Sequence, residues 1–147
     1  MKIESLAFEN NQRMPSKYTC DGEDVSPPLV ISEIPENAKT ICLIVDDPDA
    51  PTKTWVHWVV FNIPVSGNIL KIGEGEKIGV GGINDFQKLD YGGPCPPSGT
   101  HRYFFKAYAL DCDLDLQEGA TKDEVEKAME GHVIESAELV GLYSRGY

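Results

Sequence analysis

One short stretch organises this sequence, and it reads Tyr91-Gly92-Gly93-Pro94-Cys95-Pro96-Pro97-Ser98-Gly99-Thr100-His101-Arg102-Tyr103. Glycine and proline dominate its first nine residues and force a stiff, irregular loop, because proline locks φ and glycine adopts φ values that other residues avoid. The loop ends at a histidine, and the apolar run Tyr103–Leu110 follows with the composition of a strand. A stiff loop that delivers a histidine to a strand edge is typical of a binding cleft, although a plain surface turn fits the same residues.

Short apolar runs rich in β-forming residues recur along the rest of the chain, separated by Gly, Pro, Asn and Asp. Many short strands with little helix between them favour antiparallel sheets over βαβ units. We therefore predict a mainly β protein, an antiparallel β-sandwich of two sheets with Greek-key connections and one or two short helices. The expected strands are Ile3–Phe8, Leu29–Ile31, Thr40–Val45, Val56–Ile63, Tyr103–Leu110 and Ala137–Ser144, with one or two short edge strands within Gly73–Gly82.

Two local patterns refine this expectation. Thr121 and Glu124 have the spacing of a helix capping box, an apolar stripe follows at helical spacing, and Gly131 is placed to end the helix. Val56–Phe61 is apolar in both of its alternating sets of side chains, which indicates a central strand that is covered on both faces.

The composition indicates an ordinary globular domain. The 147 residues form a single expected domain, residues 1–147, with 41% hydrophobic and 25% charged residues. A net charge of −11 argues against nucleic acid or an anionic membrane as the main partner. The N-terminus has no apolar signal core and no run is long enough to span a bilayer, so we expect a cytoplasmic protein.

The four cysteines are widely spaced and form no CxxC pair, which disfavours a zinc ribbon or a thioredoxin-type motif. Free buried thiols are the default in a reducing compartment, and Cys42 lies within an apolar run that predicts a core position. Distant cysteines can still meet in space, so pairing stays open. Cys95 is either a thiol nucleophile or a small residue packed between prolines; no helix N-terminus is near to lower its pKa, which favours the packing role.

The chain has three histidines, and two of them adjoin predicted strands. Because side chains alternate along a strand, His101 and Tyr103 share one face, while Arg102 points to the other face and can pair there with a carboxylate. His57 lies at the start of a buried strand. His132 follows the predicted helix, where a charged imidazole interacts favourably with the helix dipole and needs no ligand.

A rigid acidic turn, Asp46-Asp47-Pro48-Asp49-Ala50-Pro51, closes the strand Thr40–Val45. Each proline restricts the preceding residue to an extended conformation and thereby fixes where the carboxylates point. Solvated acids in a surface turn are the plain alternative. If Asp47 meets His57, the carboxylate orients the imidazole and favours its charged form. A charged histidine beside backbone amides suits a phosphate or carboxylate ligand.

Three of these segments, in this order, resemble the signature of the phosphatidylethanolamine-binding protein (PEBP) family. They are Asp47–Pro51, His57-Trp58, and Gly93–Pro97 leading to His101-Arg102-Tyr103. Flanking segments are similar to its bacterial and archaeal branch, the Raf kinase inhibitor-like or YbhB/YbcL proteins; these segments are Cys20–Pro28, Val60–Pro64, Asn84–Phe86, Gly131-His132 and Gly141–Arg145. The resemblance spans nearly the whole chain.

The resemblance implies an antiparallel β-sandwich with a small pocket at one end that binds phosphate-like anions and phosphorylated head groups, without a cofactor or a metal. The positions that match ligand-binding residues are Asp47, His57, Pro96, Pro97, His101 and Tyr103. The positions that match supporting residues of the pocket are Asp49, Trp55, Cys95 and Arg102.

Eukaryotic members of the family have a longer C-terminal region than this sequence contains, and the acidic charge opposes docking on anionic lipid. We therefore expect a small soluble anion or a phosphorylated protein segment as the ligand, rather than a membrane. Homodimers among bacterial members leave a homodimer open here.

The sequence is compatible with three functions. The leading hypothesis is a non-catalytic binding module for a phosphorylated ligand, with an inhibitory or regulatory role. The second is a hydrolase or isomerase in which His57, His101 and Asp47 perform acid–base chemistry or hold a metal. The third is an inhibitor of a kinase or protease that acts through protein–protein contact.

Overall fold

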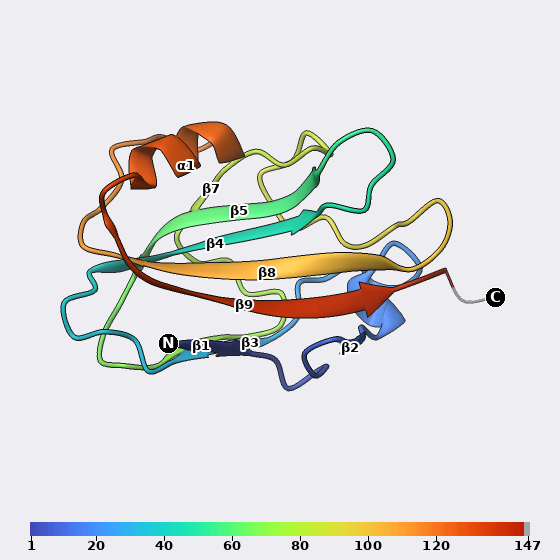
Figure 1. Ribbon diagram of the computed structural model, residues 1–147, viewed down its shortest axis with the longest axis horizontal. Helices are drawn as coiled ribbons and strands as arrows, with labels where there is room; N and C mark the ends of the chain where they lie inside the picture. The colour runs from blue at the N-terminus through green and yellow to red at the C-terminus, as the bar shows by residue number, and fades with distance from the viewer. Residues whose placement is uncertain (146–147) are drawn as a thin grey trace.

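Two β-sheets and one helix form three layers (Figure 1). The computed structural model describes residues 1–145. Its elements are the strands β1 (Lys2–Glu4), β2 (Gln12–Arg13), β3 (Leu29–Ser32), β4 (Thr40–Asp47), β5 (Trp55–Pro64), β6 (Leu70–Ile72), β7 (Val80–Gly81), β8 (His101–Leu110) and β9 (Val133–Tyr143), the 3-10 helix η1 (Ser16–Tyr18) and the α-helix α1 (Lys122–Met129). The predicted mainly β fold is confirmed.

The larger sheet has the strand order β2-β9-β8-β4-β5-β7, and the smaller sheet has the order β1-β3-β6. The strand β8 pairs with β4 rather than with β7, so the chain crosses over in the manner expected for a Greek key. One pair departs from the antiparallel prediction: the two-residue strand β2 runs parallel to β9. This pairing joins segments from opposite ends of the chain, and no local pattern predicts it.

The strand β4 separates two hydrophobic cores and is buried along its whole length. Ile41, Leu43 and Val45 face the small sheet, whereas Cys42 and Ile44 face α1. This division follows from the period of two along a strand. The expected core position of Cys42 is confirmed, and its burial raises the pKa of the thiol to about 12.

The helix α1 begins and ends where the sequence predicts. The Thr121 hydroxyl accepts a hydrogen bond from the Glu124 amide at 3.1 Å, and the Glu124 carboxylate accepts one from the Thr121 amide at 3.0 Å. Gly131, with φ of 80°, follows the helix in the left-handed conformation that ends many helices. The helix covers the outer face of the large sheet and buries Val125 and Met129 there (Figure 1).

The prediction for the first strand is wrong in extent. The first strand ends at Glu4 instead of Phe8, because the chain turns there and inserts the Phe8 ring into the core against Phe105 at 5.6 Å. The prediction of one or two short edge strands within Gly73–Gly82 is confirmed by one, β7, which lies at the edge of the large sheet. None of the helices in residues 1–145 has the length and apolar character needed to cross a bilayer.

We expect the substitution Thr121→Ala to lower the free energy of unfolding by about 1 kcal/mol, because it removes the hydroxyl that accepts a hydrogen bond from the Glu124 amide at the start of α1. Urea unfolding followed by far-UV circular dichroism measures this change. Thr121→Ser, which keeps the hydroxyl, serves as the matched control and should retain most of the stability. Equal losses in the two variants would contradict the capping role.

Candidate functional site

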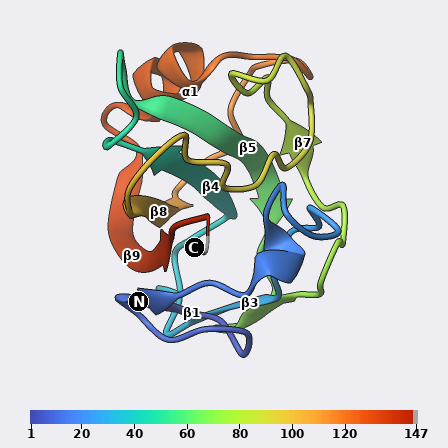
Figure 2. The same ribbon diagram turned by 90° about the vertical axis from the view of Figure 1, so that its right-hand side faces the viewer.

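A cavity of about 190 Å³ opens at the end of the molecule where β4 ends and β8 begins, the end that faces the viewer in Figure 2. Three strand ends and two loops supply its walls. The lining includes all six predicted ligand-binding residues, Asp47, His57, Pro96, Pro97, His101 and Tyr103, together with the predicted supporting residues Trp55 and Cys95. Residues from four separate segments of the sequence therefore meet here as expected.

Asp47 pairs with His101 at the floor of the cavity. The His101 ring donates from Nδ1 to Asp47 Oδ2 at 2.6 Å, and both side chains are buried. The second carboxylate oxygen, Oδ1, accepts a hydrogen bond from the Asp49 amide at 2.7 Å. Both oxygens of Asp47 are thus in use, which fixes the orientation of His101 and leaves its Nε2 for a ligand.

The histidine that Asp47 orients is therefore His101 and not His57, whose pairing with Asp47 the sequence left conditional. The His57 ring donates from Nδ1 to the Gly92 carbonyl at 2.6 Å, and the Gly92 amide donates to the His57 carbonyl at 3.0 Å. The cause is a β-bulge: Val45 pairs with Trp58 and Asp46 pairs with Val56, so His57 is the extra residue. A bulge redirects a side chain, and here it turns His57 towards the loop that forms the cavity wall.

Burial lowers the pKa of His57 below its ordinary value of 6.5, more strongly than the Gly92 carbonyl and the nearby carboxylates raise it. The ring is therefore neutral at neutral pH, with its proton on Nδ1. Its Nε2 then carries a lone pair and accepts rather than donates. Protonation at Nε2 would convert this atom into a donor for an anion.

Tyr103 lies between the two imidazoles. Its ring contacts His57 edge-on at 5.1 Å and stacks on His101 at 6.4 Å. Burial, followed by the charge of Asp47, raises the pKa of the Tyr103 hydroxyl well above 10. The hydroxyl is buried, yet within residues 1–145 it makes no hydrogen bond of ordinary geometry, despite its proximity to Asp47. A buried donor without a partner is unfavourable, and a ligand in the cavity could accept from it.

Asp49 and Arg102 lie outside the cavity lining. The guanidinium forms a two-pronged contact with the carboxylate, with N–O distances of 2.8 and 2.9 Å, and the Arg102 amide donates to the same carboxylate at 2.9 Å. These bonds lower the pKa of Asp49 to about 2. Arg102 points away from His101, as strand alternation predicts, and its contact with Asp49 holds the acidic turn against β8.

Cys95 forms a disulfide with Cys20, with a sequence separation of 75 residues. The expectation of a free Cys95 packed between prolines is therefore wrong, and so is the default of free thiols for Cys20. The bond excludes Cys95 as a thiol nucleophile while the disulfide is intact. Cys42 and Cys112 remain free thiols.

The disulfide is part of a larger attachment between the cavity loop and residues 18–24. The Cys20 amide donates to the Pro94 carbonyl at 3.1 Å, and the Gly93 amide donates to Asp24 Oδ1 at 2.8 Å. At Gly93 a Cβ atom would collide with the Tyr18 carbonyl oxygen and with Asp24. Glycine is required at this position because two backbone segments pass so close together.

Three further residues line the cavity without having been predicted as site residues, Ala50, Pro51 and Phe86. The Phe86 ring contacts Trp55 at 5.6 Å and His57 at 5.3 Å, and together with Trp55 it gives the cavity an apolar side. The side chain of Asn84 positions this segment by donating to the His57 carbonyl at 3.1 Å and to the Asp90 carbonyl at 2.6 Å. The segment Asn84–Phe86 was noted for its family resemblance alone.

The third histidine, His132, is not part of this site. It lies at the other end of β8, where its ring pairs with Asp111. Within the cavity, a metal held by two histidines and Asp47 would have to displace the hydrogen bonds that both oxygens of Asp47 already make. The geometry therefore favours Asp47 as a positioning residue over a metal ligand.

Comparison with known proteins identifies the family. The family described as phosphatidylethanolamine-binding protein matches residues 4–144. The chain belongs to this family. A UPF0098 protein of Methanothermobacter thermautotrophicus is 53% identical to this chain, and the match covers 99% of this chain and all of the relative. A UPF0098 protein of Pyrococcus abyssi is 52% identical, over 99% of this chain and 85% of the relative.

Two solved structures have the same fold. A crystal structure described as a PEBP homologue from Chlamydia trachomatis superposes with a TM-score of 0.93 at 42% identity, and the match covers 99% of this chain and 97% of that one. The crystal structure of E. coli YbcL, described as a member of the mammalian PEBP family, superposes with a TM-score of 0.89 at 30% identity, over 99% and 98% of the two chains. The predicted family is confirmed.

We expect the double substitution Cys20→Ser/Cys95→Ser to lower the free energy of unfolding by about 2–5 kcal/mol, because a crosslink over 75 residues restricts the unfolded chain. Guanidinium unfolding under non-reducing conditions measures the loss, and the wild-type protein with dithiothreitol should lose a similar amount. Cys112→Ser, which removes a free thiol, is the control. A double variant as stable as the wild type would disprove the structural role of the bond.

We expect His57 to make stability fall as pH decreases below about 6.5. The unfolded chain binds a proton near pH 6.5, but the buried ring in the fold binds it only at lower pH, so acid favours unfolding. The His57 contribution is fully present above pH 6.5, and its slope is at most about 1.4 kcal/mol per pH unit. Urea unfolding at pH 7.5, 6.5 and 5.5 in chloride buffer tests this expectation against His57→Gln, which should lack this slope; identical slopes would refute it.

Proposed function

We propose that the cavity is a binding site for a small phosphate-like anion, either free or as the head group of a phosphorylated compound. The strongest support is the buried Tyr103 hydroxyl, which makes no hydrogen bond of ordinary geometry within residues 1–145 and lies between two imidazoles. A tetrahedral anion offers several acceptor oxygens to such converging donors. The name of the family, phosphatidylethanolamine-binding protein, is consistent with this ligand class.

The size of the cavity supports a head group rather than a whole lipid. Its volume of about 190 Å³ is several times the share of one water molecule, about 30 Å³, and is below the 300–1,000 Å³ typical of sites for drug-sized ligands. Trp55 and Phe86 provide an apolar side against which the carbon atoms of a head group can pack.

The charge of the cavity makes binding depend on pH. Among the described residues that line it, none is a lysine or an arginine, and the whole chain carries a net charge of −11. The positive charge for an anion must therefore come from the imidazoles. Because burial keeps His57 neutral at neutral pH, acidification strengthens binding by placing a proton on its Nε2.

The same geometry favours binding over catalysis. Cys95 is engaged in the disulfide, and the described lining contains no serine or threonine that could act as a nucleophile. Asp47 is already bonded through both oxygens. A phosphorylated protein segment would present the same anion to the cavity, and titration with a phosphoserine peptide would distinguish it from a small molecule.

We expect calorimetric titration at pH 5.5 and low ionic strength to detect sulfate binding to the wild-type protein. Sulfate is the first probe because it does not titrate between pH 5.5 and pH 7.5, so any change in affinity reports on the protein. Affinity should decrease at pH 7.5. Phosphoethanolamine then tests whether a head group binds more tightly than the bare anion.

The variant Tyr103→Phe removes only the unpartnered hydroxyl and should weaken sulfate binding about tenfold or more, as expected for a hydrogen bond to a charged group. His57→Gln should abolish the pH dependence. His132→Asn, at a histidine outside the cavity, should bind like the wild type. The proposal fails if the wild type does not bind either probe at either pH, or if Tyr103→Phe binds as tightly as the wild type.

A further inference from the structure

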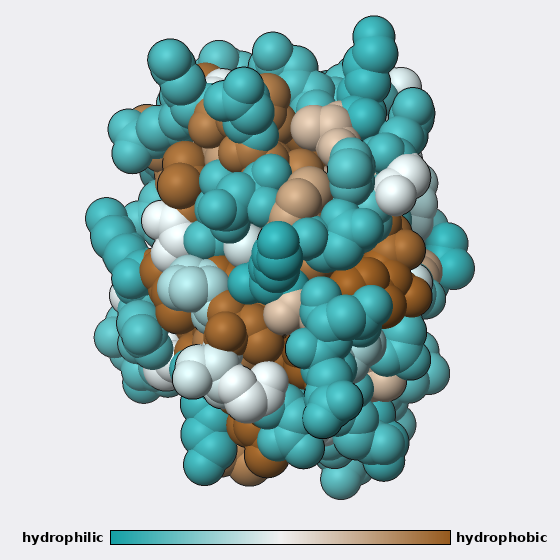
Figure 3. Space-filling model, turned by 90° about the vertical axis from the view of Figure 1, so that its left-hand side faces the viewer, coloured by the Kyte–Doolittle hydropathy of each residue, from teal (hydrophilic) through white to brown (hydrophobic). Residues whose placement is uncertain are grey.

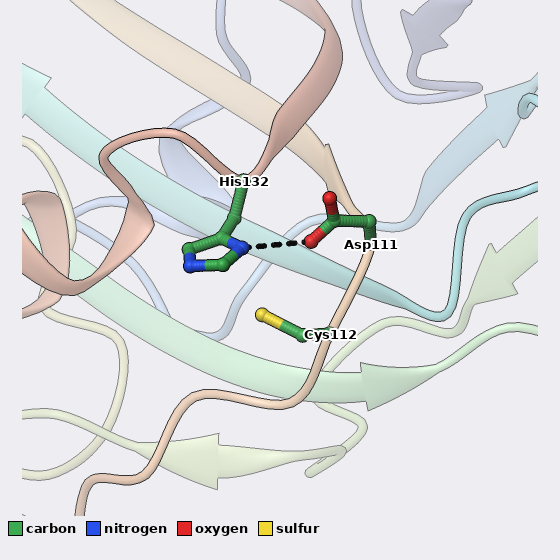
Figure 4. A group of neighbouring side chains, drawn as sticks. All are labelled: Asp111, Cys112 and His132. Atoms are coloured by element: carbon green, nitrogen blue, oxygen red, sulfur yellow. Dashed lines mark hydrogen bonds and ion pairs between the residues drawn. The ribbon is translucent and has the colours of Figure 1, made fainter.

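A second group of reactive side chains lies at the end of the molecule opposite the cavity. Asp111, Cys112 and His132 each offer one ligand atom, and these atoms all lie within 4.8 Å of one another. Figure 4 shows the His132 ring directed at Asp111, with the Cys112 sulfur beside both. The ten residues of β8 separate this group from the cavity, a span of roughly 30 Å at 3.3 Å per residue.

The backbone holds the three residues in place independently of their side chains. The Asp111 amide donates to the His132 carbonyl at 3.1 Å, and the His132 amide donates to the Met129 carbonyl at 2.9 Å. The Thr40 hydroxyl donates to the Cys112 carbonyl at 2.9 Å. The group is therefore preorganised, because its members come from two segments that are already hydrogen-bonded to each other or to β4.

The three side chains differ in the hydrogen bonds and charges that already act on them. The His132 ring donates from Nδ1 to Asp111 Oδ1 at 2.9 Å, and this bond is the main cause that lowers the pKa of Asp111. The Cys112 thiol is partly buried, and its pKa is raised by burial first and then by the carboxylates of Asp111 and Asp113. The charge of Lys39 lowers the pKa of both groups, so it adds to the shift of Asp111 and opposes the shift of Cys112.

We propose that Asp111, Cys112 and His132 form a binding site for a divalent transition metal, with zinc as the expected ion. The donor set of one sulfur, one nitrogen and one oxygen is typical of zinc and of its spectroscopic substitute cobalt, whereas magnesium and calcium prefer oxygen ligands alone. Three protein ligands leave one tetrahedral position for water or for a ligand from solution.

The charges of the group balance such an ion. Metal binding displaces the thiol proton of Cys112 to solvent, while His132 binds as the neutral imidazole. The resulting thiolate and the Asp111 carboxylate carry two negative charges, which match one divalent cation. A cation also reverses the effect of the surrounding carboxylates, because it stabilises the thiolate that they disfavour.

The site is accessible from solvent. The side chains of His132 and Asp111 are 46% and 49% exposed, and hydrophilic residues cover much of this end of the molecule (Figure 3). The net charge of −11 favours the approach of cations. A bound ion would join the segment after β8 to the turn between α1 and β9, and would thereby close the loop that contains α1.

Cobalt titration of the untagged, metal-free protein with its disulfide intact tests the proposal. We expect one cobalt ion per chain, tetrahedral visible bands and a thiolate-to-cobalt charge-transfer band in the near ultraviolet. The charge-transfer band identifies Cys112 specifically, because Cys20 and Cys95 are paired and Cys42 is fully buried. Cys112→Ser should abolish this band, and His132→Ala and Asp111→Asn should each weaken cobalt binding at least about tenfold.

Asp113→Asn is the matched control, since it removes a neighbouring carboxylate outside the group and should keep the stoichiometry and the band. Zinc at a concentration a hundredfold above its dissociation constant should raise the thermal midpoint of the wild type by roughly 5 °C or more, but not that of Cys112→Ser. His132→Ala provides the same comparison if the cysteine variant does not fold. No charge-transfer band in the wild type, or a band that persists in Cys112→Ser, would overturn the proposal.

Discussion

The rest of the molecule depends on how the buried strand β4 ends. The strand is covered on both faces, so every charged side chain at its end needs a partner. Its last two residues are aspartates that point to opposite faces. Asp46 is fully buried on the side of α1, where Lys106 and Lys122 contact it at 3.2 and 2.8 Å. Asp47 points to the other side and holds His101. Unpaired buried charges are strongly unfavourable, so both aspartates must be paired. The pairing of Asp46 attaches α1 to the sheet, and the pairing of Asp47 forms the floor of the cavity.

The cavity combines a rigid floor with walls that are attached from outside the sheet. Asp47, His101 and Tyr103 occupy paired strand positions, Asp47 opposite Trp55 on β5 and the other two opposite residues of β9, so the strand pairing fixes their spacing. The loops that form the walls are not held by strand pairing. They are held by the bulge at His57, by the close backbone contact at Gly93 and by the disulfide. This division explains why the cavity needs both a sheet that is covered on its two faces and a loop rich in glycine and proline.

Residues whose role follows from local periodicity could be predicted from the sequence. The common face of His101 and Tyr103, the outward Arg102 and the capped helix all follow from spacing along one element, and the order of short motifs identified the family. The partner of His57 could not be predicted, because Val56–Phe61 is apolar in both alternating sets and such a strand gives no signal of a bulge. The bond between Cys20 and Cys95 was missed for a related reason, since 75 intervening residues carry no pattern that brings the two together.

The disulfide has a consequence that extends beyond the stability of the fold. Cys95 adjoins Pro96 in the cavity wall, so the disulfide and the proposed ligand would contact one structural element. Thermodynamic coupling between two events on one protein is reciprocal. A ligand that binds more tightly to the crosslinked loop must also make the crosslink harder to reduce, by the same factor. The reduction potential of the disulfide would then change with the occupancy of the cavity, so a measurement of either quantity reports on the other.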